Sequence, residues 1–435
     1  MESLQSLKEG IASGRLIGTH SLKVSDHLSE FPEEILALSD SLELLVLSDN
    51  ALRSLPETFS QLKNIKVVFF NNNRFESFPS VLAQCPNLSM ISFKGNQLTK
   101  VPEGVLSPNI RWLILTDNRI TALPNDIGRL SKLQKLMLAG NKLRSLPPEM
   151  QNCTRLELVR LSANQLTELP EWIFTLPRLA WVAYAGNPFC EKREERALPV
   201  VKMNDLDLGE VLGQGASGVI YQAEWAGETV AVKLFKGEVT SDGLPLDEMR
   251  ACIAAGNHPN LVDVLAKLDI TAEKAGLIFS FISADYQNLG GPPSLDSCTR
   301  DTYSEETAFS LAVVLKIARG VAEAIAHLHA RSILHGDLYA HNILINPSGS
   351  SILGDFGAAS FFTPKTALAL QRIESRAYGC LLEDLLDRCL IDAKDQNSEK
   401  TEESRIFDKL RHLQKRCMSA QPTARPSFKE ICETL

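Results

Sequence analysis

The sequence has no run of about 18 or more apolar residues, so it predicts no membrane-spanning helix. Its first residues, MESLQSLKEGIASGR, lack the apolar core of a signal peptide. The nine cysteines are scattered singly without a CxxC pair, which argues against a disulfide framework and a zinc site. Positively charged residues are not in excess, since the formal net charge is −8. The sequence therefore gives no electrostatic reason to expect binding to nucleic acid. We therefore expect a cytoplasmic protein with reduced thiols.

The first half of the chain instead contains a regular repeat. Asparagines recur at spacings of 23, 23, 22, 23, 23 and 23 residues, at Asn50, Asn73, Asn96, Asn118, Asn141, Asn164 and Asn187. Each lies in the frame LxxLxLxxNxL, and a degenerate copy with Asp26 precedes them. The leucines should share one core, and each asparagine amide should bond backbone groups that a turn leaves unpaired. About eight repeats follow an amphipathic helical cap expected over residues 2–15.

The outward-facing side chains of these repeats are mostly apolar. In the frame LxxLxLxxN, the third and fifth positions point away from the core. These positions include Val67, Phe69, Met90, Trp112, Ile114, Met137 and Trp181. Because exposed apolar patches usually mark contact surfaces, we expect this concave face to bind a protein substrate or regulator, or the other half of the chain. With the register shifted by one residue, the same side chains would face inwards.

The second half contains a stretch, HGDLYAHNIL followed by LGDFG, that carries three oxygen-bearing side chains. Asp337 precedes a predicted strand at 343–345, and Asp355 follows a second predicted strand at 351–353, with Asn342 between the two acids. The arrangement suits a magnesium-assisted phosphoryl transfer. Asn342 and Asp355 would supply hard oxygen ligands, and Asp337 would accept the proton of an attacking hydroxyl.

Motifs upstream of this stretch indicate a nucleotide site. The segment LGQGASGV contains a GxGxxG spacing between two strand-like segments, and its candidate residues are Leu212, Gly213, Gly215, Gly218 and Val219. A GxGxxG alone is a weak signal, but its place between strands favours a kinase loop over a dinucleotide fold. The segment VAVK then supplies Ala231 and Lys233, and the later strand GLIFS supplies Phe279 as a back wall.

From about residue 206 onwards these motifs resemble a eukaryotic-type protein kinase domain, and the repeats resemble a leucine-rich repeat array. The resemblance implies an α/β leucine-rich repeat solenoid at 1–190, a charged linker at 191–205 and an α+β bilobal protein kinase fold at 206–435. It also implies ATP and Mg²⁺ as cofactors. Lys233 would hold the nucleotide phosphates and pair with Glu248, with Asp247 as the alternative partner.

Four features depart from the kinase pattern. Gly336 stands where the family has an arginine that pairs with a phosphorylated activation loop, so switching by phosphorylation is not expected. Tyr339 fits neither the serine/threonine nor the tyrosine kinase pattern. Only 19 residues separate Asp355 from Glu374, which begins a segment similar to the family's DVYSFG helix start, and no APE motif lies between them. Arg425 consequently lacks its usual glutamate and should pair with another acid or stay solvated.

The sequence therefore predicts an ATP-dependent protein kinase, serine/threonine-specific, whose repeats bind a substrate or a regulator. The alternative is a catalytically weak or inactive pseudokinase scaffold in which the repeats bind a partner protein. A kinase for a small molecule is a third hypothesis, which the truncated activation segment would suit.

Overall fold

The computed structural model describes residues 2–190, 196–237, 239–269, 275–390 and 401–435. The chain divides into two compact units, Met1–Leu176 with Asn187–Phe189, and Pro177–Gly186 with Cys190–Leu435. The predicted domain boundaries at 190 and 206 stay predictions. The compact units follow a different division, because residues 177–186 and Cys190 belong with the second unit.

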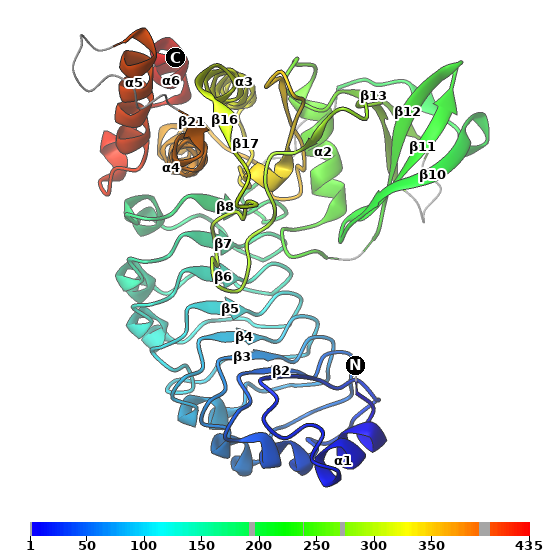
Figure 1. Ribbon diagram of the computed structural model, residues 1–435, viewed down its shortest axis with the longest axis vertical. Helices are drawn as coiled ribbons and strands as arrows, with labels where there is room; N and C mark the ends of the chain where they lie inside the picture. The colour runs from blue at the N-terminus through cyan, green and yellow to red at the C-terminus, as the bar shows by residue number, and fades with distance from the viewer. Residues whose placement is uncertain (1, 191–195, 238, 270–274, 391–400) are drawn as a thin grey trace. The chain divides into compact units, whose positions relative to one another are not determined.

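The first unit is a repeat solenoid, as predicted. Ser3 caps helix α1 (Leu4–Ala12), which packs beside the 3₁₀ turn Glu33–Leu38. Successive parallel strands, visible as stacked rungs in Figure 1, alternate with short 3₁₀ turns. The strands of this unit are β1 (Ser21–Lys23), β2 (Leu44–Val46), β3 (Val67–Phe69), β4 (Met90–Ser92), β5 (Trp112–Ile114), β6 (Lys135–Met137) and β7 (Leu158–Arg160), in chain order. The strand of the last repeat, β8 (Trp181–Ala183), belongs to the second unit.

The strand register agrees with the sequence prediction. In β3, Val68 is the central residue and is buried, whereas Val67 and Phe69 flank it on the other side of the strand. The neighbouring strands pair in step, with Val68 opposite Leu45 and Ile91. The third and fifth positions of the frame therefore point away from the shared core, and the alternative register is wrong. The expected exposure is not found throughout, however, because Met90, Ile114 and Met137 are buried, at 4%, 8% and 7% exposure.

The repeated asparagines form a ladder of buried hydrogen bonds. The side-chain Nδ2 of Asn73 donates to the carbonyls of Leu47 (2.8 Å) and Phe70 (3.1 Å). Its Oδ1 accepts the backbone N–H of Leu52 at 2.9 Å. Asn96, in the next repeat, makes the same three kinds of bond. The spacing of the asparagines is fixed because each amide satisfies backbone groups in its own repeat and in the preceding one.

Replacing Asn73 with alanine should destabilise the first unit by about 2–4 kcal/mol, because buried backbone groups would lose their partners. Asn152 lies exposed in the turn Pro148–Asn152, so Asn152→Ala is the matched control and should change stability by less than about 0.5 kcal/mol. Urea unfolding of both variants measures the difference. Equal effects would show that the ladder does not stabilise the repeats.

The second unit has a strand-rich lobe and a helical lobe. The first lobe is a six-stranded sheet in the order β10-β11-β12-β14-β13-β9. Its strands are β9 (Val200–Val201), β10 (Asp207–Gln214), β11 (Gly218–Trp225), β12 (Glu228–Phe235), β13 (Val264–Leu268) and β14 (Gly276–Ser280), with helix α2 (Pro245–Ala255) between β12 and β13. Its core includes Val230, Val232 and Ile278. Residues 200–201 of the predicted linker thus belong to this sheet, while 191–195 lie outside the described residues.

The second lobe is built from helices α3 (Leu311–Ala330), α4 (Ala367–Asp387), α5 (Glu402–Cys417) and α6 (Phe428–Thr434), which are yellow to red in Figure 1. Short strand pairs are β15 (Gln287–Asn288) with β18 (Ile343–Ile345), β16 (Phe309–Ser310) with β21 (Cys389–Leu390), and β17 (Ile333–Leu334) with β20 (Ser360–Phe361). The predicted hairpin is confirmed, because β18 pairs antiparallel with β19 (Ser351–Leu353). None of the described helices is long and apolar enough to cross a membrane.

Candidate active site

A lysine and a glutamate meet inside the strand-rich lobe. Lys233 on β12 contacts Glu248 on α2 through its Nζ and Oε1 atoms, and both side chains are largely buried. Burial alone lowers the pKa of Lys233, but the negative charges of Glu248 and Asp355 raise it above its ordinary value. The lysine is therefore a fixed positive charge. Asp247, the alternative partner, instead binds Arg250 at 2.9 Å.

Removing the charge of Glu248 tests whether it orients this lysine. Glu248→Gln should weaken nucleotide binding by about 10- to 100-fold, because hydrogen bonds to charged groups contribute about 1.5–3 kcal/mol. Asp247→Asn is the matched control, since that carboxylate pairs with Arg250 on the same helix. Titration calorimetry with an ATP analogue measures both variants. Equal losses would contradict the orienting role of Glu248.

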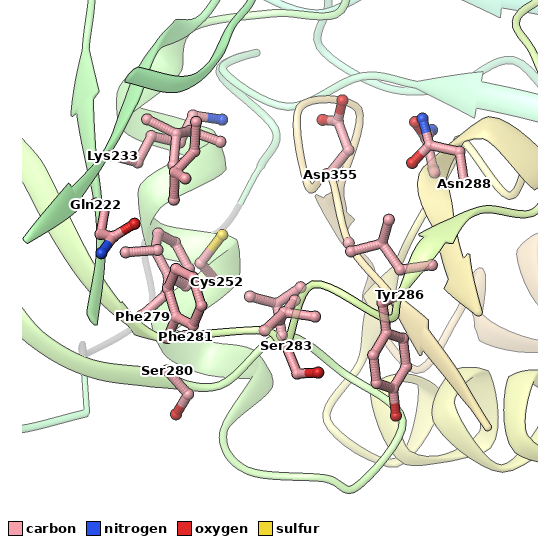
Figure 2. A pocket seen from close by; sticks show the side chains of 18 of the residues that line it. Gln222, Lys233, Cys252, Phe279, Ser280, Phe281, Ser283, Tyr286, Asn288 and Asp355 are labelled. Carbon is pink, nitrogen blue, oxygen red and sulfur yellow. The ribbon is translucent and has the colours of Figure 1, made fainter. Parts of the chain in front are cut away.

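A cavity of about 670 Å³ lies beside this pair. Of the predicted nucleotide-binding residues, Leu212, Ala231, Lys233 and Phe279 line it, together with Asn342 and Asp355. Figure 2 shows Lys233 and Asp355 at one end of the cavity and Ser280 and Ser283 at the other. The polar end therefore combines a cation with metal-binding oxygen groups, while the remaining wall is mostly apolar, as nucleotide sites commonly are.

The glycine-rich turn joins β10 and β11, whose residues Leu212 and Ile220 line the cavity. Gly215 N–H donates to the Gly218 carbonyl at 2.9 Å, and a Cβ on Gly218 would lie 2.4 Å from the Leu234 carbonyl. Gly213 and Gly215 have open space at their Cβ positions. Neither these glycines nor Val219 is among the residues that line the cavity, and their binding of the nucleotide stays a prediction. The next residue, Ile220, does line the cavity, because it stands opposite Lys233 in the β11–β12 ladder and neighbouring strand residues face opposite sides.

The predicted catalytic loop holds Asp337 from several sides. Asn342 Nδ2 donates to the Asp337 carbonyl and to its Oδ2, both at 2.9 Å. His335 is buried and its Nδ1 accepts the Asp337 N–H at 3.3 Å. The ring Nε2 of His335 is 2.9 Å from the Gly354 carbonyl, next to Asp355. These bonds bring all three predicted oxygen-bearing residues into one connected site.

Asn342 and Asp355 fit a divalent metal. Both line the same cavity, and the amide nitrogen of Asn342 donates to Asp337, so its Oδ1 is the atom that would bind a metal. Asp355 adopts a φ of 53° and accepts the Gly357 N–H at 3.0 Å through Oδ1. No group of three or more His, Cys, Asp or Glu that could hold a metal occurs among the described residues. An amide and one carboxylate match Mg²⁺, which is usually held by one or two carboxylates together with substrate phosphates.

Two acidic residues support the loop without having been predicted to do so. Asp301 accepts the Ala340 N–H at 2.5 Å and lies 2.6 Å from His341 Nδ1, and His341 lines the cavity. Burial lowers the pKa of His341, but hydrogen bonding to Asp301 together with its charge raises it above the ordinary value. Asp301 lies 40 residues before His341 in the sequence, and no local sequence pattern identifies it as a partner of the loop.

Glu374 is the second supporting acid. It is buried, and its carboxylate accepts the Gly336 N–H at 2.7 Å and contacts His329 Nε2 at 2.7 Å. The likeness of its segment to DVYSFG did signal this position. However, Glu374 lies inside α4, which begins at Ala367, so the segment is not the start of the helix.

The expectation for Arg425 was wrong. Its side chain is only 1% exposed, and its guanidinium donates to the carbonyls of Pro177 (2.7 Å), Leu179 (3.3 Å), Arg372 (3.3 Å) and Ser419 (2.9 Å). Burial lowers the pKa of Arg425 to about 10, which still leaves it charged at neutral pH. Backbone carbonyls thus take the place of the missing acid.

A lysine paired with a helical glutamate, facing an acid-bearing loop across a cavity between two lobes, is the arrangement of protein kinases. Sequence comparison agrees with this class. Residues 206–380 match the protein kinase domain family, and residues 36–105 and 108–166 match the leucine rich repeat family. The chain is therefore a leucine-rich repeat array followed by a protein kinase domain.

Two individual relatives illustrate these matches. The "Probable serine/threonine-protein kinase gdt4" of Dictyostelium discoideum is 28% identical over 169 residues, which are 38% of this chain. The match spans only 10% of that relative's length. A solved leucine-rich repeat protein of Leptospira interrogans is 27% identical and covers 39% of this chain and 49% of its own. Its TM-score of 0.34 is too low to support a conclusion about the fold.

Proposed function

We propose that the protein is an ATP-dependent protein kinase that phosphorylates serine or threonine. The observation that carries this proposal is the shared cavity, where Lys233, Asn342 and Asp355 meet next to Asp337. Phosphoryl transfer depends mainly on positioning and charge stabilisation, and these four residues supply suitable groups for both.

Each residue has a separate role in this proposal. Lys233, kept charged by Glu248, binds the nucleotide phosphates. Asn342 and Asp355 hold Mg²⁺, which neutralises phosphate charge when it is bound. Asp337, oriented by Asn342, positions the acceptor hydroxyl and takes its proton. Leu212, Ala231 and Phe279 form the apolar walls around the base.

The choice of acceptor is supported by the relative named a serine/threonine kinase, which matches only part of this chain. We further propose that the repeats bind a protein substrate or regulator through the half-buried side chains of Val67, Phe69 and Trp112, since repeat arrays present extended binding surfaces. A cytoplasmic location suits the nine cysteines, which are scattered singly along the sequence without a CxxC pair.

Transfer of labelled γ-phosphate to a generic protein acceptor tests the activity. We expect labelling with Mg²⁺, its loss when EDTA removes the metal, and its return when excess Mg²⁺ is added. Identification of the labelled amino acid then separates serine and threonine from tyrosine. Labelling of tyrosine alone would contradict the proposed specificity, and labelling that persists in EDTA would contradict the roles of Asn342 and Asp355.

A second candidate function is a nucleotide-binding scaffold without turnover. The observation that favours it is the burial of Tyr339, which lies two residues after Asp337 and is only 4% exposed. An extended peptide therefore cannot lie against this residue. Binding of ATP without transfer to any acceptor would support the scaffold and contradict the kinase.

A further inference from the structure

Residues 177–186 are packed against the catalytic loop within the second unit. The indole ring of Trp181 stacks on the Tyr339 ring with centroids 4.4 Å apart and planes inclined by 7°. Its Nε1–H donates to the Leu338 carbonyl at 3.0 Å. Trp181 is only 2% exposed, although the sequence predicted it as a surface residue of the repeats. It is therefore attached to the two residues that directly follow Asp337.

The same segment is attached to the strand that follows the DFG sequence. The Tyr184 N–H donates to Ser360 Oγ at 3.0 Å, and the Tyr184 hydroxyl donates to the Phe361 carbonyl at 3.3 Å. Ser360 and Phe361 form β20, which pairs with β17 immediately before the catalytic loop. The segment thus contacts both the catalytic loop and the strand that pairs with β17.

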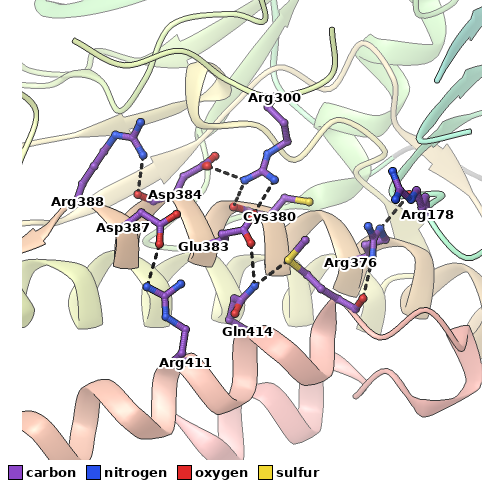
Figure 3. A network of polar contacts seen from close by, with 11 residues as sticks. Arg178, Arg300, Arg376, Cys380, Glu383, Asp384, Asp387, Arg388, Arg411 and Gln414 are labelled. Carbon is purple, nitrogen blue, oxygen red and sulfur yellow. Dashed lines mark hydrogen bonds and ion pairs between the residues drawn. The ribbon is translucent and has the colours of Figure 1, made fainter. Parts of the chain in front are cut away.

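Two arginines fix the beginning of the segment. Arg425 donates to Pro177 and Leu179, as described above, and Arg376 on α4 donates through Nε to the Arg178 carbonyl at 3.0 Å. Figure 3 shows Arg376 between Arg178 and the helix that follows α4. Charge-assisted bonds to three successive carbonyl groups are stronger than neutral ones, so the segment is firmly anchored.

The glycine at position 336 fits this arrangement. Its φ is +74°, and a Cβ there would lie 2.6 Å from the Val182 carbonyl and 2.8 Å from the Ala358 carbonyl. The space next to the loop, where the kinase pattern carries an arginine, is therefore filled by the backbone of the segment. Residues 177–186 thus occupy the space that is left both by the absent arginine and by the short activation segment.

We propose that residues 177–186 take over the task of the truncated activation segment, and that Trp181 is a positioning residue that holds the catalytic loop for phosphoryl transfer. This inference rests on the proposed function. Because the anchoring groups are side chains and backbone carbonyls rather than a phosphate, the loop is held in place permanently. The enzyme should be active as synthesised, without prior phosphorylation.

The test uses the full chain with Trp181→Ala and Trp181→Phe. Trp172 offers a matched control, because it lies in the 3₁₀ turn Glu171–Thr175 of the first unit and its Nε1 has no hydrogen-bond partner. Steady-state kinetics give kcat and the KM for ATP. Hydrogen exchange of the Gly336 and Asn342 amides, which are bonded to Glu374 and Tyr339, reports the order of the loop without requiring activity.

For Trp181→Ala we expect kcat to fall by about 10- to 100-fold, the effect of a small misplacement, with the KM for ATP within about twofold. Trp181→Phe keeps an aromatic ring and loses the Leu338 bond, so kcat should fall by about fivefold. The loop amides should exchange faster in both variants, whereas those of β11 and β12 should not change. Trp172→Ala should match the wild type.

Equal kinetics and equal exchange in the Trp181 and Trp172 variants would overturn the proposal. A rise in KM for ATP in step with the loss of kcat would overturn it as well, because it would indicate general damage to the fold. If Trp181→Ala does not fold, Trp181→Phe decides through the same measurements. If the wild type transfers no phosphate, the proposed function fails, and hydrogen exchange alone decides whether Trp181 holds the loop.

Discussion

Replacing Asp337 with asparagine should lower phosphotransfer by about 100- to 10,000-fold, the range that proton transfer by a positioned side chain contributes. Asparagine has nearly the same size, so the bond from Asn342 to the side-chain oxygen can persist while the proton acceptor is lost. The loss corresponds to about 3–5 kcal/mol in the activation barrier. Nucleotide binding should change little, because Lys233 and Glu248 are untouched.

The control for this experiment is Asp207→Asn, which removes a carboxylate at an exposed position of β10. Transfer of labelled γ-phosphate and binding of an ATP analogue are measured for both variants. Unchanged transfer in Asp337→Asn would remove Asp337 from the mechanism. Loss of nucleotide binding together with transfer would indicate that the carboxylate supports the site as a whole, and not the acceptor alone.

Replacing Gly336 with alanine should produce the largest loss of stability, about 2–5 kcal/mol in the free energy of unfolding. Two effects combine, since the left-handed backbone costs a residue with a Cβ about 1–2 kcal/mol and the clash with the carbonyls of Val182 and Ala358 adds about 1–3 kcal/mol. The catalytic loop should also shift, so activity should fall in the protein that remains folded.

Gly227 provides a control that separates these effects. Its φ of +83° is similarly left-handed, but a Cβ there would meet no atom within 4 Å. Gly227→Ala should therefore cost only the backbone part, about 1–2 kcal/mol. Urea unfolding of the full chain compares the two variants. Equal losses of stability in the two variants would mean that the Val182 carbonyl can move away from the added Cβ at little cost. Residues 177–186 would then not be tightly packed against Gly336.

Features with a local, repeated pattern could be predicted from the sequence. The period of 22 or 23 residues placed each asparagine in its ladder. The segments Ile343–Ile345 and Ser351–Leu353 placed the hairpin that lies between Asp337 and Asp355. The VAVK motif and the following helix placed Lys233 near Glu248. Each of these elements depends on residues close together in the chain or on a pattern with a fixed period.

Contacts between distant segments could not be predicted in the same way. Trp181 reads as one more member of an apolar column, and only its contact with Tyr339, more than 150 residues later, reveals its position. The partners of Arg425 are backbone carbonyls, which every residue type has, so the sequence cannot show which residues supply them. The one signal in the sequence was the joint absence of an arginine at position 336 and of an APE motif, which did not identify the residues that fill these places.

The membership of residues 177–186 in the kinase unit has a consequence for protein engineering. A hybrid that exchanges the repeats of this protein for others should join the two sequences before Pro177, so that the carbonyls bound by Arg425 and the ring of Trp181 are retained. A junction at residue 190, where the repeat motif ends, would separate the kinase from part of its own support. The last repeat is therefore inherited with the enzyme, whereas the earlier repeats are free to be exchanged.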